Sequence, residues 1–308
     1  MTPLKKQLGS TLATLRLAFG ASLMYAQPSQ AQVAMRQIKG LGGEITLIYP
    51  TAQIATVQRM GPFEIEVAFS AKPGPLHGRL IVMSHGSGGS ALSDHSLART
   101  LALAGFVVAQ PIHQGDNWQD SSDVGPVTWK RRPLEITQAI DAVAADAMFA
   151  SLINFNKTGV HGMSAGGVSA LTLAGAQWST KQFIQHCTNQ FQADRNFCMF
   201  GARSEKEIPA SFRNISLPLA ITSASADELL VPQFHSDYVL KHCLSCIALT
   251  RLEGAGHFDT LSPWPESIAK PVAEQMPGGK LGKDFDSTQR QIAFDKIAQF
   301  FVQTLLKP

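Results

Sequence analysis

Ser164 stands between Gly162 and Gly166 in the stretch "HGMSAGG" (161–167). A serine hydroxyl attacks an ester carbonyl only slowly until a neighbouring base removes its proton. Glycines two residues before and after a serine allow a tight strand-to-helix turn that exposes the hydroxyl. The spacing therefore predicts a nucleophile at Ser164, and the alternative is a serine in an ordinary glycine-rich loop.

A serine nucleophile needs a histidine as its base, and His257 in "EGAGHFDTL" is the candidate. Of the nine histidines, it is the one that lies after Ser164 in a predicted strand-end loop. His235 and His242 fall inside a predicted helix, and a lone histidine otherwise has a structural role more often than a catalytic one. We predict that His257 is the general base.

The histidine in turn needs a carboxylate that orients its ring. Asp227 in "LAITSASADELLVP" comes shortly after an apolar run, where a strand is expected to end. Its neighbour Glu228 is the competitor, and the remaining alternative is a carboxylate on a surface loop. We predict Asp227, which gives the chain order serine, acid, histidine.

The negative oxygen that forms during acyl transfer needs two preorganised N–H donors. One is expected from Ala165, directly after the nucleophile, and the other from Ser87 in the glycine-rich loop "SHGSGGS" (84–90). We interpret His85 in this loop as a bracing residue and not as a base.

Short apolar runs alternate with amphipathic segments, which predicts alternating strands and helices. In that arrangement the loops that carry the predicted site residues lie at one edge of a sheet. Extended segments at 44–50 and 63–70 predict an antiparallel start. The following segments predict buried strands in 78–89, 106–113 and 157–164, separated by helices at 94–105, 133–147 and 165–176. Alternation returns at 217–232 and 246–258, and a helix closes the chain at 288–306. The pattern predicts one α/β domain over 32–308. It has a mostly parallel central sheet, helices on both faces and a lid-like insertion at 177–213.

The N-terminal 31 residues have the pattern of a signal peptide. Lys5 and Lys6 precede an apolar stretch that is too short to span a bilayer, and a short polar segment follows it. We predict cleavage after Ala31, with Ala26 as the second choice, and a periplasmic or secreted protein. The net charge of +3 is small and dispersed, which does not suggest nucleic-acid binding.

Four cysteines follow in the predicted mature chain. In an oxidising compartment four cysteines allow three pairings, and proximity in sequence favours Cys187–Cys198 and Cys243–Cys246. The second pair has the spacing of half a zinc site, but no second ligand pair accompanies it. The segment "HQGDN" contains three residue types that can bind a metal ion, His113, Asp116 and Asn117. We expect instead that this segment is a loop that shapes the pocket near its mouth. No metal is predicted.

Several blocks resemble the bacterial "predicted dienelactone hydrolase" group of α/β-hydrolases, which is related to plasma-type platelet-activating-factor acetylhydrolases. The blocks run from about residue 44 to the last helix and include "GPFEIEVAFS", "SHGSGGS", "RRPLEITQAIDAV", "GMSAGG" and "QHCTNQFQADRNFC". The resemblance implies the α/β-hydrolase fold of a serine esterase with Ser164, Asp227 and His257 as its triad. Authentic dienelactone hydrolases use a cysteine nucleophile, so turnover of dienelactones is not expected here. Met163 replaces the histidine or phenylalanine of many relatives, which changes the shape of the pocket.

The sequence therefore predicts an exported carboxylic-ester hydrolase that works through an acyl-enzyme and needs no cofactor. Its substrate would be a small-molecule or polymeric ester. The same triad could cut amides or polymers such as polyesters and polyamides, and the modest insertion would leave an open groove for a chain. A non-catalytic binding protein on the same scaffold is disfavoured because no triad residue is missing. The oligomeric state is not predicted.

Overall fold

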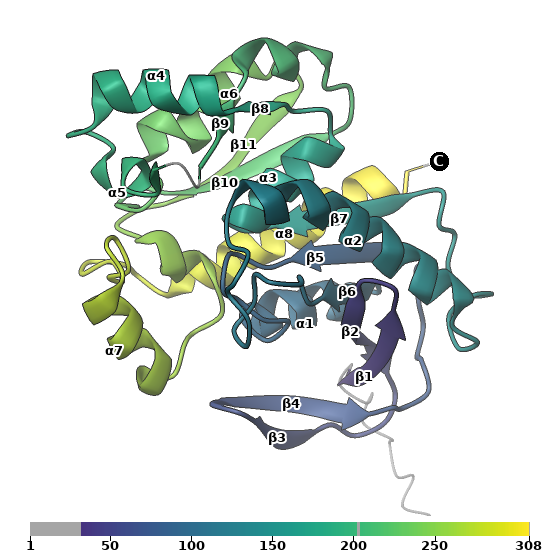
Figure 1. Cartoon of the computed structure of the whole chain (residues 1–308). Coiled ribbons are helices and arrows are strands. Elements are labelled where there is room, and N and C mark those ends of the chain that lie inside the picture. The colour runs from purple at the N-terminus through teal and green to yellow at the C-terminus, as the bar shows by residue number, and fades with distance from the viewer. Residues whose placement is uncertain (1–31, 202–203, 308) are drawn as a thin grey trace, which may run out of the picture. The chain divides into compact units, whose positions relative to one another are not determined.

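Apolar runs that are buried on both faces form the middle of the main sheet in the computed structural model, which describes residues 32–201 and 204–307 (Figure 1). Seven strands lie in the order β3-β4-β1-β2-β6-β5-β7. Their bounds are β1 Gln32–Gly40, β2 Gly43–Thr51, β3 Thr56–Met60, β4 Phe63–Phe69, β5 Leu80–Ser84, β6 Val107–Pro111 and β7 Thr158–Gly162. Strands β6, β5 and β7 run parallel, whereas β1 and β2 are antiparallel and form the start of the sheet.

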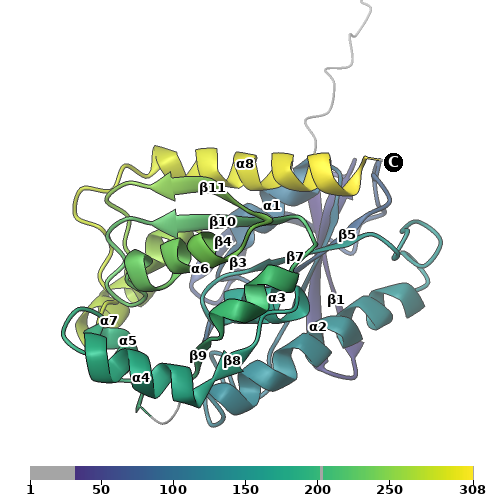
Figure 2. The same ribbon diagram turned by 90° about the horizontal axis from the view of Figure 1, so that it is seen from above.

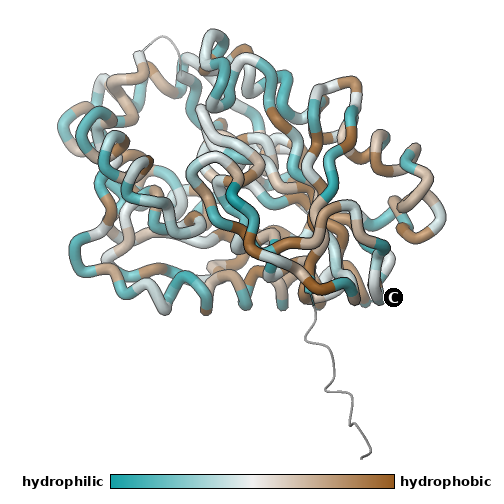
Figure 3. The backbone as a smooth tube through the Cα atoms, turned by 90° about the horizontal axis from the view of Figure 1, so that it is seen from below, coloured by the Kyte–Doolittle hydropathy of each residue, from teal (hydrophilic) through white to brown (hydrophobic). Residues whose placement is uncertain are grey.

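Helices cover both faces of this sheet (Figure 2). The α-helices are α1 His95–Leu103, α2 Pro126–Ala145, α3 Ala165–Leu173, α4 Thr180–Gln190, α5 Arg195–Cys198, α6 Ser236–His242, α7 Glu266–Gln275 and α8 Thr288–Leu305. Helices α1 and α8 pack on one face, and α2 packs on the other. The apolar residues of α8 recur on one side of the helix, and its hydrophobic and hydrophilic residues alternate accordingly in Figure 3.

Strand β5 shows why a continuous apolar run is needed here. Ile81 and Met83 point to the core formed with α1 and α8, while Leu80 and Val82 point to the core formed with α2. Successive side chains of a strand point to opposite faces, so a strand covered on both sides is apolar at nearly every position, and in β5 the polar residue is Ser84 at its end. All five residues of β5 are buried.

The chain reverses direction across the sheet at β5. Helix α1 leads from β5 to β6 on one side, and α2 leads from β6 back past β5 to β7 on the other side. In α/β sheets ligands bind where the strand order reverses in this way, outside the carboxyl ends of the strands. The loop at 85–89 follows β5 and the turn at Ser164 follows β7, so both lie at this point.

Two later strands, β10 (Leu219–Ala224) and β11 (Cys246–Leu252), form a separate parallel pair. They run beside α8, as Figure 2 shows, and are not hydrogen-bonded to β7 within the described part of the chain. The predicted mostly parallel arrangement is thus confirmed, but its hydrogen bonding is interrupted between β7 and β10.

Several elements differ from the sequence-based expectations. Strand β1 was not expected, because Arg36, Gln37 and Lys39 interrupt its apolar pattern. Strand β3 was not expected either, and none of its residues is buried. Helix α2 begins at Pro126 and not at Pro133, which lies inside the helix. Helix α7 was also not expected, since it contains Pro271 and buries none of its side chains.

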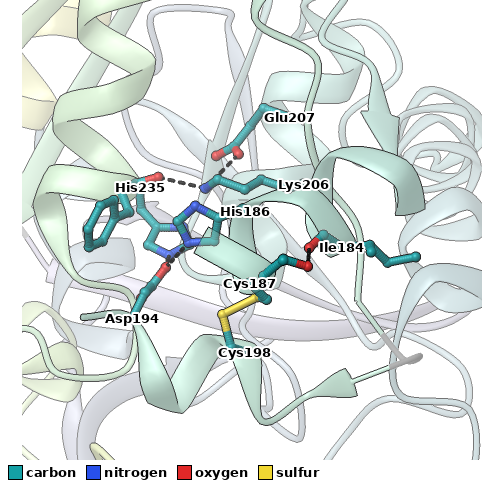
Figure 4. Close-up of a disulfide and its surroundings, with 10 residues drawn as sticks. Ile184, His186, Cys187, Asp194, Cys198, Lys206, Glu207 and His235 are labelled. Carbon is teal, nitrogen blue, oxygen red and sulfur yellow. Dashed lines mark hydrogen bonds and ion pairs between the residues drawn. A yellow bond between two sulfur atoms is a disulfide. The ribbon is translucent and has the colours of Figure 1, made fainter. Parts of the chain in front are cut away.

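The segment 177–213 contains α4, α5, and the short strands β8 (Trp178–Ser179) and β9 (Lys206–Glu207), and it ends within the 3-10 helix Pro209–Asn214. The disulfide Cys187–Cys198 links α4 to α5 (Figure 4), and Cys243–Cys246 forms the second bridge, so both predicted pairings are confirmed. The Oδ2 atom of Asp194 lies 2.8 Å from His186 Nε2 and 3.0 Å from His235 Nε2, which ties this segment to the chain before α6.

None of the helices in residues 32–201 and 204–307 is both long and apolar enough to cross a bilayer. The predicted signal peptide and its cleavage sites lie outside the described residues.

Candidate active site

Ser164 occupies the turn between β7 and α3 with φ 55° and ψ −120°, a conformation that costs energy for a residue other than glycine. The two flanking glycines make the turn possible. A Cβ atom on Gly162 would overlap the backbone of Gly166, and one on Gly166 would overlap the carbonyl group of Ser84 at the end of β5. The sequence spacing thus reflects close approach of three backbone segments.

The side chains of Ser164, His257 and Asp227 form one chain of hydrogen-bonding distances, although 93 positions separate the first two residues. His257 Nε2 lies 3.1 Å from Ser164 Oγ, and His257 Nδ1 lies 2.8 Å from Asp227 Oδ2. A neutral ring protonated on Nδ1 would donate to the carboxylate and accept the serine proton at Nε2.

Asp227 is held by its own backbone surroundings. Its Oδ1 atom accepts hydrogen bonds from the N–H groups of Leu229, at 2.9 Å, and Leu230, at 2.8 Å. Its Oδ2 atom is left to face His257. The competing carboxylate, Glu228, is exposed to solvent, and no side-chain contact to His257 is found for it.

His257 is fixed by a residue that the sequence analysis missed, Asp259. The Oδ2 atom of Asp259 accepts from the N–H of Gly256, at 2.9 Å, and from the N–H of Gly282, at 2.6 Å. Arg290 on α8 donates to the carbonyl oxygen of Asp259 at 2.8 Å. These bonds hold the loop of His257 against the last helix. In the sequence, this role of Asp259 could have been suspected only from its place two residues after His257 in "GHFDT".

The two predicted N–H donors lie beside the serine. Among the described residues, the N–H of Ser87 has no acceptor, and Ala165 is the first residue of α3, where N–H groups lack helical partners. The 85–89 loop is close to the nucleophile, since a Cβ atom on Gly86 would lie 3.2 Å from Ser164 Cβ. Both donors are therefore available at the edge where the hydroxyl is exposed.

The "HQGDN" residues do not line the cavity, contrary to the expectation that they shape the pocket. His113 and Asp116 are fully buried beneath the 85–89 loop. His113 Nδ1 lies 2.6 Å from a Glu135 oxygen, and its Nε2 lies 2.7 Å from Ser84 Oγ. The acidic partner stands on α2, 22 positions away, which is why the motif alone did not reveal this role.

His85 braces the loop, as its contacts show. Its Nδ1 lies 2.7 Å from the carbonyl oxygen of Gly86, and its Nε2 accepts from the N–H of His113. Burial, together with the nearby His113 and Arg132, lowers the pKa of His85 well below its usual value. The ring is therefore neutral at physiological pH, in agreement with one donating and one accepting nitrogen.

A second acidic group lies at the cavity wall. Burial raises the pKa of Asp94 to about 7 and lowers the pKa of His161 to about 4. Asp94 Oδ2 is 3.8 Å from His161 Nε2, and Ser262 Oγ is 3.4 Å from Asp94 Oδ1. At pH 7 His161 is therefore neutral, whereas Asp94 is about half ionised.

A cavity opens onto Ser164 and His257 and continues into the space between β7, β10 and α8, with a total volume of about 1610 Å³. Aromatic side chains contribute much of its wall: Trp118, Trp129, Phe197, Phe200, Phe258 and Trp264. The segment 177–213 supplies two of these, so it forms part of the cavity wall.

The described residues hold one group with a metal-like arrangement, His186, Cys187 and Cys198. The two sulfur atoms are bonded to each other, so neither is a thiolate that could bind a metal ion.

No protein-family model matches the sequence, and no curated protein is similar to it at a significant level. Among solved structures, the chain is similar to a ferulic acid esterase from Streptomyces cinnamoneus, with a TM-score of 0.59 and 18% identity. The alignment covers 91% of this chain and 92% of that chain. At this identity the likeness concerns the fold, and with the strand order above it defines an α/β-hydrolase fold. The resemblance to the dienelactone hydrolase group stays a prediction.

Proposed function

We propose that the protein is an exported carboxylic-ester hydrolase with Ser164, His257 and Asp227 as its catalytic triad. The observation that carries this proposal is the 3.1 Å distance from His257 Nε2 to Ser164 Oγ, together with the 2.8 Å distance from His257 Nδ1 to Asp227. The likeness in fold to a ferulic acid esterase supports ester hydrolysis.

In the first half-reaction, Ser164 Oγ attacks the ester carbonyl carbon while its proton moves to His257 Nε2. The carbonyl π electrons move to the oxygen, which becomes an oxyanion held by the N–H groups of Ser87 and Ala165. The tetrahedral intermediate then collapses. The bond from carbon to the alcohol oxygen breaks, and His257 gives its proton to the leaving alcohol.

Water completes the cycle. His257 removes a proton from a water molecule as its oxygen attacks the acyl-enzyme, and a second tetrahedral intermediate expels Ser164 Oγ, which regains its proton. Asp227 stays ionised throughout and stabilises the imidazolium. Two backbone N–H bonds to its other oxygen keep the carboxylate in the required orientation.

The cavity favours a bulky apolar ester. Its aromatic wall offers apolar surface beside Ser164 and His257, and this favours aryl esters or a segment of a polyester chain as the substrate. The hydrolysis rates of an aromatic ester and a short aliphatic ester at equal concentration would show whether the enzyme prefers a bulky apolar substrate. Release of soluble fragments from a polyester film would identify a polymer substrate.

The test uses the Ser164→Ala variant. It should lose nearly all hydrolysis of a p-nitrophenyl ester and all labelling by a fluorophosphonate, because both reactions need the hydroxyl. Ser122, an exposed serine, provides the control variant Ser122→Ala, which should behave as the unmodified protein. Undiminished hydrolysis by a folded Ser164→Ala variant would refute the proposal.

Export is supported by the two disulfides, which persist in oxidising compartments. Cell fractionation and sequencing of the mature N-terminus would test it. Full-length protein in the cytoplasm would contradict it.

A further inference from the structure

A fully buried ion pair lies directly beneath the 85–89 loop. Arg132 on α2 and Asp116 after β6 are both 0% exposed, and Arg132 Nη2 lies 2.8 Å from Asp116 Oδ2. Burying two charges costs several kcal/mol of solvation per ion, and the attraction between them often does no more than offset this cost. Stability alone is therefore a weak reason for this pair, and its other contacts point to a different role.

The guanidinium of Arg132 binds the loop from below. It donates to the carbonyl oxygens of His85 and Gly86, and it also donates to the carbonyl oxygen of Asp116 at 3.3 Å. Two consecutive loop carbonyls are thus turned toward the positive charge and away from the site. The planar fork of arginine can hold several acceptors in one fixed geometry, which a lysine ammonium cannot reproduce.

The carboxylate of Asp116 binds the next two residues of the loop. Its Oδ1 atom accepts from the N–H of Gly88 at 2.9 Å, and its Oδ2 atom accepts from Ser87 Oγ at 3.3 Å. Every residue from 85 to 88 therefore contacts the ion pair. The N–H of Ser87, which has no acceptor in the described structure, is held between these contacts.

We propose that Asp116 and Arg132 are positioning residues that hold the N–H of Ser87 toward the oxyanion. This inference rests on the proposed ester hydrolysis. Carbonyls directed at Arg132 and an N–H directed at Asp116 fix the peptide planes on either side of Ser87, and so fix the direction of its own N–H. The pair is neutral overall, so the carboxylate places no net negative charge beside the developing oxyanion.

The expected effect is on kcat. Oxyanion donors act chiefly in the transition state, and loss of one costs about 10²–10³ in kcat when the donor is removed outright. Asp116→Asn leaves the donor present but less well held, so we expect a loss of about 10- to 100-fold in kcat with KM within about threefold. Arg132→Lys keeps the positive charge and should show a similar loss.

Asp146→Asn is the matched control, because Asp146 also accepts from an arginine, Arg36 at 2.9 Å, but at the far end of α2. It should leave kcat unchanged. The second readout is the affinity for a trifluoromethyl ketone, whose adduct with a serine carries a tetrahedral oxyanion. The Asp116→Asn and Arg132→Lys variants should lose this affinity by the same factor as kcat/KM, and should keep their affinity for a product carboxylic acid.

Ser164→Ala is measured in parallel, so that the two proposals can fail separately. If Ser164→Ala keeps its activity, the proposed function is wrong. If it is inactive but folded Asp116→Asn and Arg132→Lys match the unmodified protein in kcat and in ketone affinity, the positioning role is wrong. The role is also wrong if KM rises at constant kcat, or if the lost activity equals the unfolded fraction measured by circular dichroism. Should Asp116→Asn fail to fold, Arg132→Lys alone decides.

Discussion

Asp227→Asn is the substitution whose outcome the structure specifies most sharply. The Oδ1 atom of Asp227 accepts from two backbone N–H groups, so an asparagine must place its carbonyl oxygen there and its NH2 group toward His257. The NH2 group can only donate, which forces His257 Nδ1 to accept and places the ring proton on Nε2. In that tautomer Nε2 can no longer remove the proton of Ser164.

The expected loss is about 10⁴ in kcat, the size seen when a triad histidine is held in the wrong tautomer. At 1.36 kcal/mol per factor of ten, this equals about 5 kcal/mol of transition-state stabilisation. KM should change little, because Asp227 is expected to contact no substrate. The assay is steady-state hydrolysis of a p-nitrophenyl ester, with a thermal unfolding curve to show that the variant is folded.

Glu228→Gln makes the same chemical change at the adjacent, exposed position and should leave kcat within about twofold. A kcat of Asp227→Asn within tenfold of that of the unmodified protein would refute the reasoning, and so would a large loss of kcat in Glu228→Gln. Either result would show that another group orients the histidine.

Three further predictions concern stability. Gly166→Ala should destabilise the protein by more than about 3 kcal/mol in urea unfolding, because its Cβ would overlap the carbonyl at the end of β5, whereas Gly167→Ala has space and should be nearly neutral. Burial raises the pKa of Asp94 to about 7, above its unfolded value of 3.8, so the folded state binds more protons and this group destabilises increasingly as pH rises from about 4 to 7. Asp94→Asn should accordingly gain stability over the unmodified protein at pH 8 relative to pH 4, and an equal difference at both values would contradict this. Replacing Cys187 and Cys198 by serine opens a loop of 11 positions and should cost about 3 kcal/mol in the unfolding free energy, and an unchanged urea midpoint would count against it.

The candidate triad could be proposed from the sequence because each of its residues belongs to a local pattern. Ser164 was recognisable because close backbone approach demands glycine at 162 and 166, and this demand is visible in the sequence itself. Asp227 and His257 were placed by their order after apolar runs. Strands β5 and β6 were recognisable for a related reason, since a strand covered on both faces is mostly apolar.

The residues that support the site could not be found in this way. Arg132 reads as part of a basic run, "KRR", and nothing local shows that its side chain is fully buried. Its partner Asp116 lies 16 positions earlier, and the pair meets only when α2 crosses the sheet. Sequence periodicity reports which residues face inward, but it does not report which buried polar groups will meet.

Helix α2 supplies one residue to each of two buried polar pairs, Arg132–Asp116 and Glu135–His113. The helix thereby links the packing of the sheet to the geometry of the site. Its buried side chains follow one face of the helix: Thr128, Arg132, Glu135, Ile136, Ala139 and Val143. The apolar residues at the C-terminal end of this face pack on the sheet, while Arg132 and Glu135, one turn apart, reach the 85–89 loop and His113. The same face of α2 contacts both the core and the 85–89 loop. A shift of α2 along the sheet would therefore also move the Arg132 guanidinium that binds the loop carbonyls. Core substitutions such as Val143→Ala should therefore lower activity only if they displace α2, and the affinity for the trifluoromethyl ketone would report that displacement.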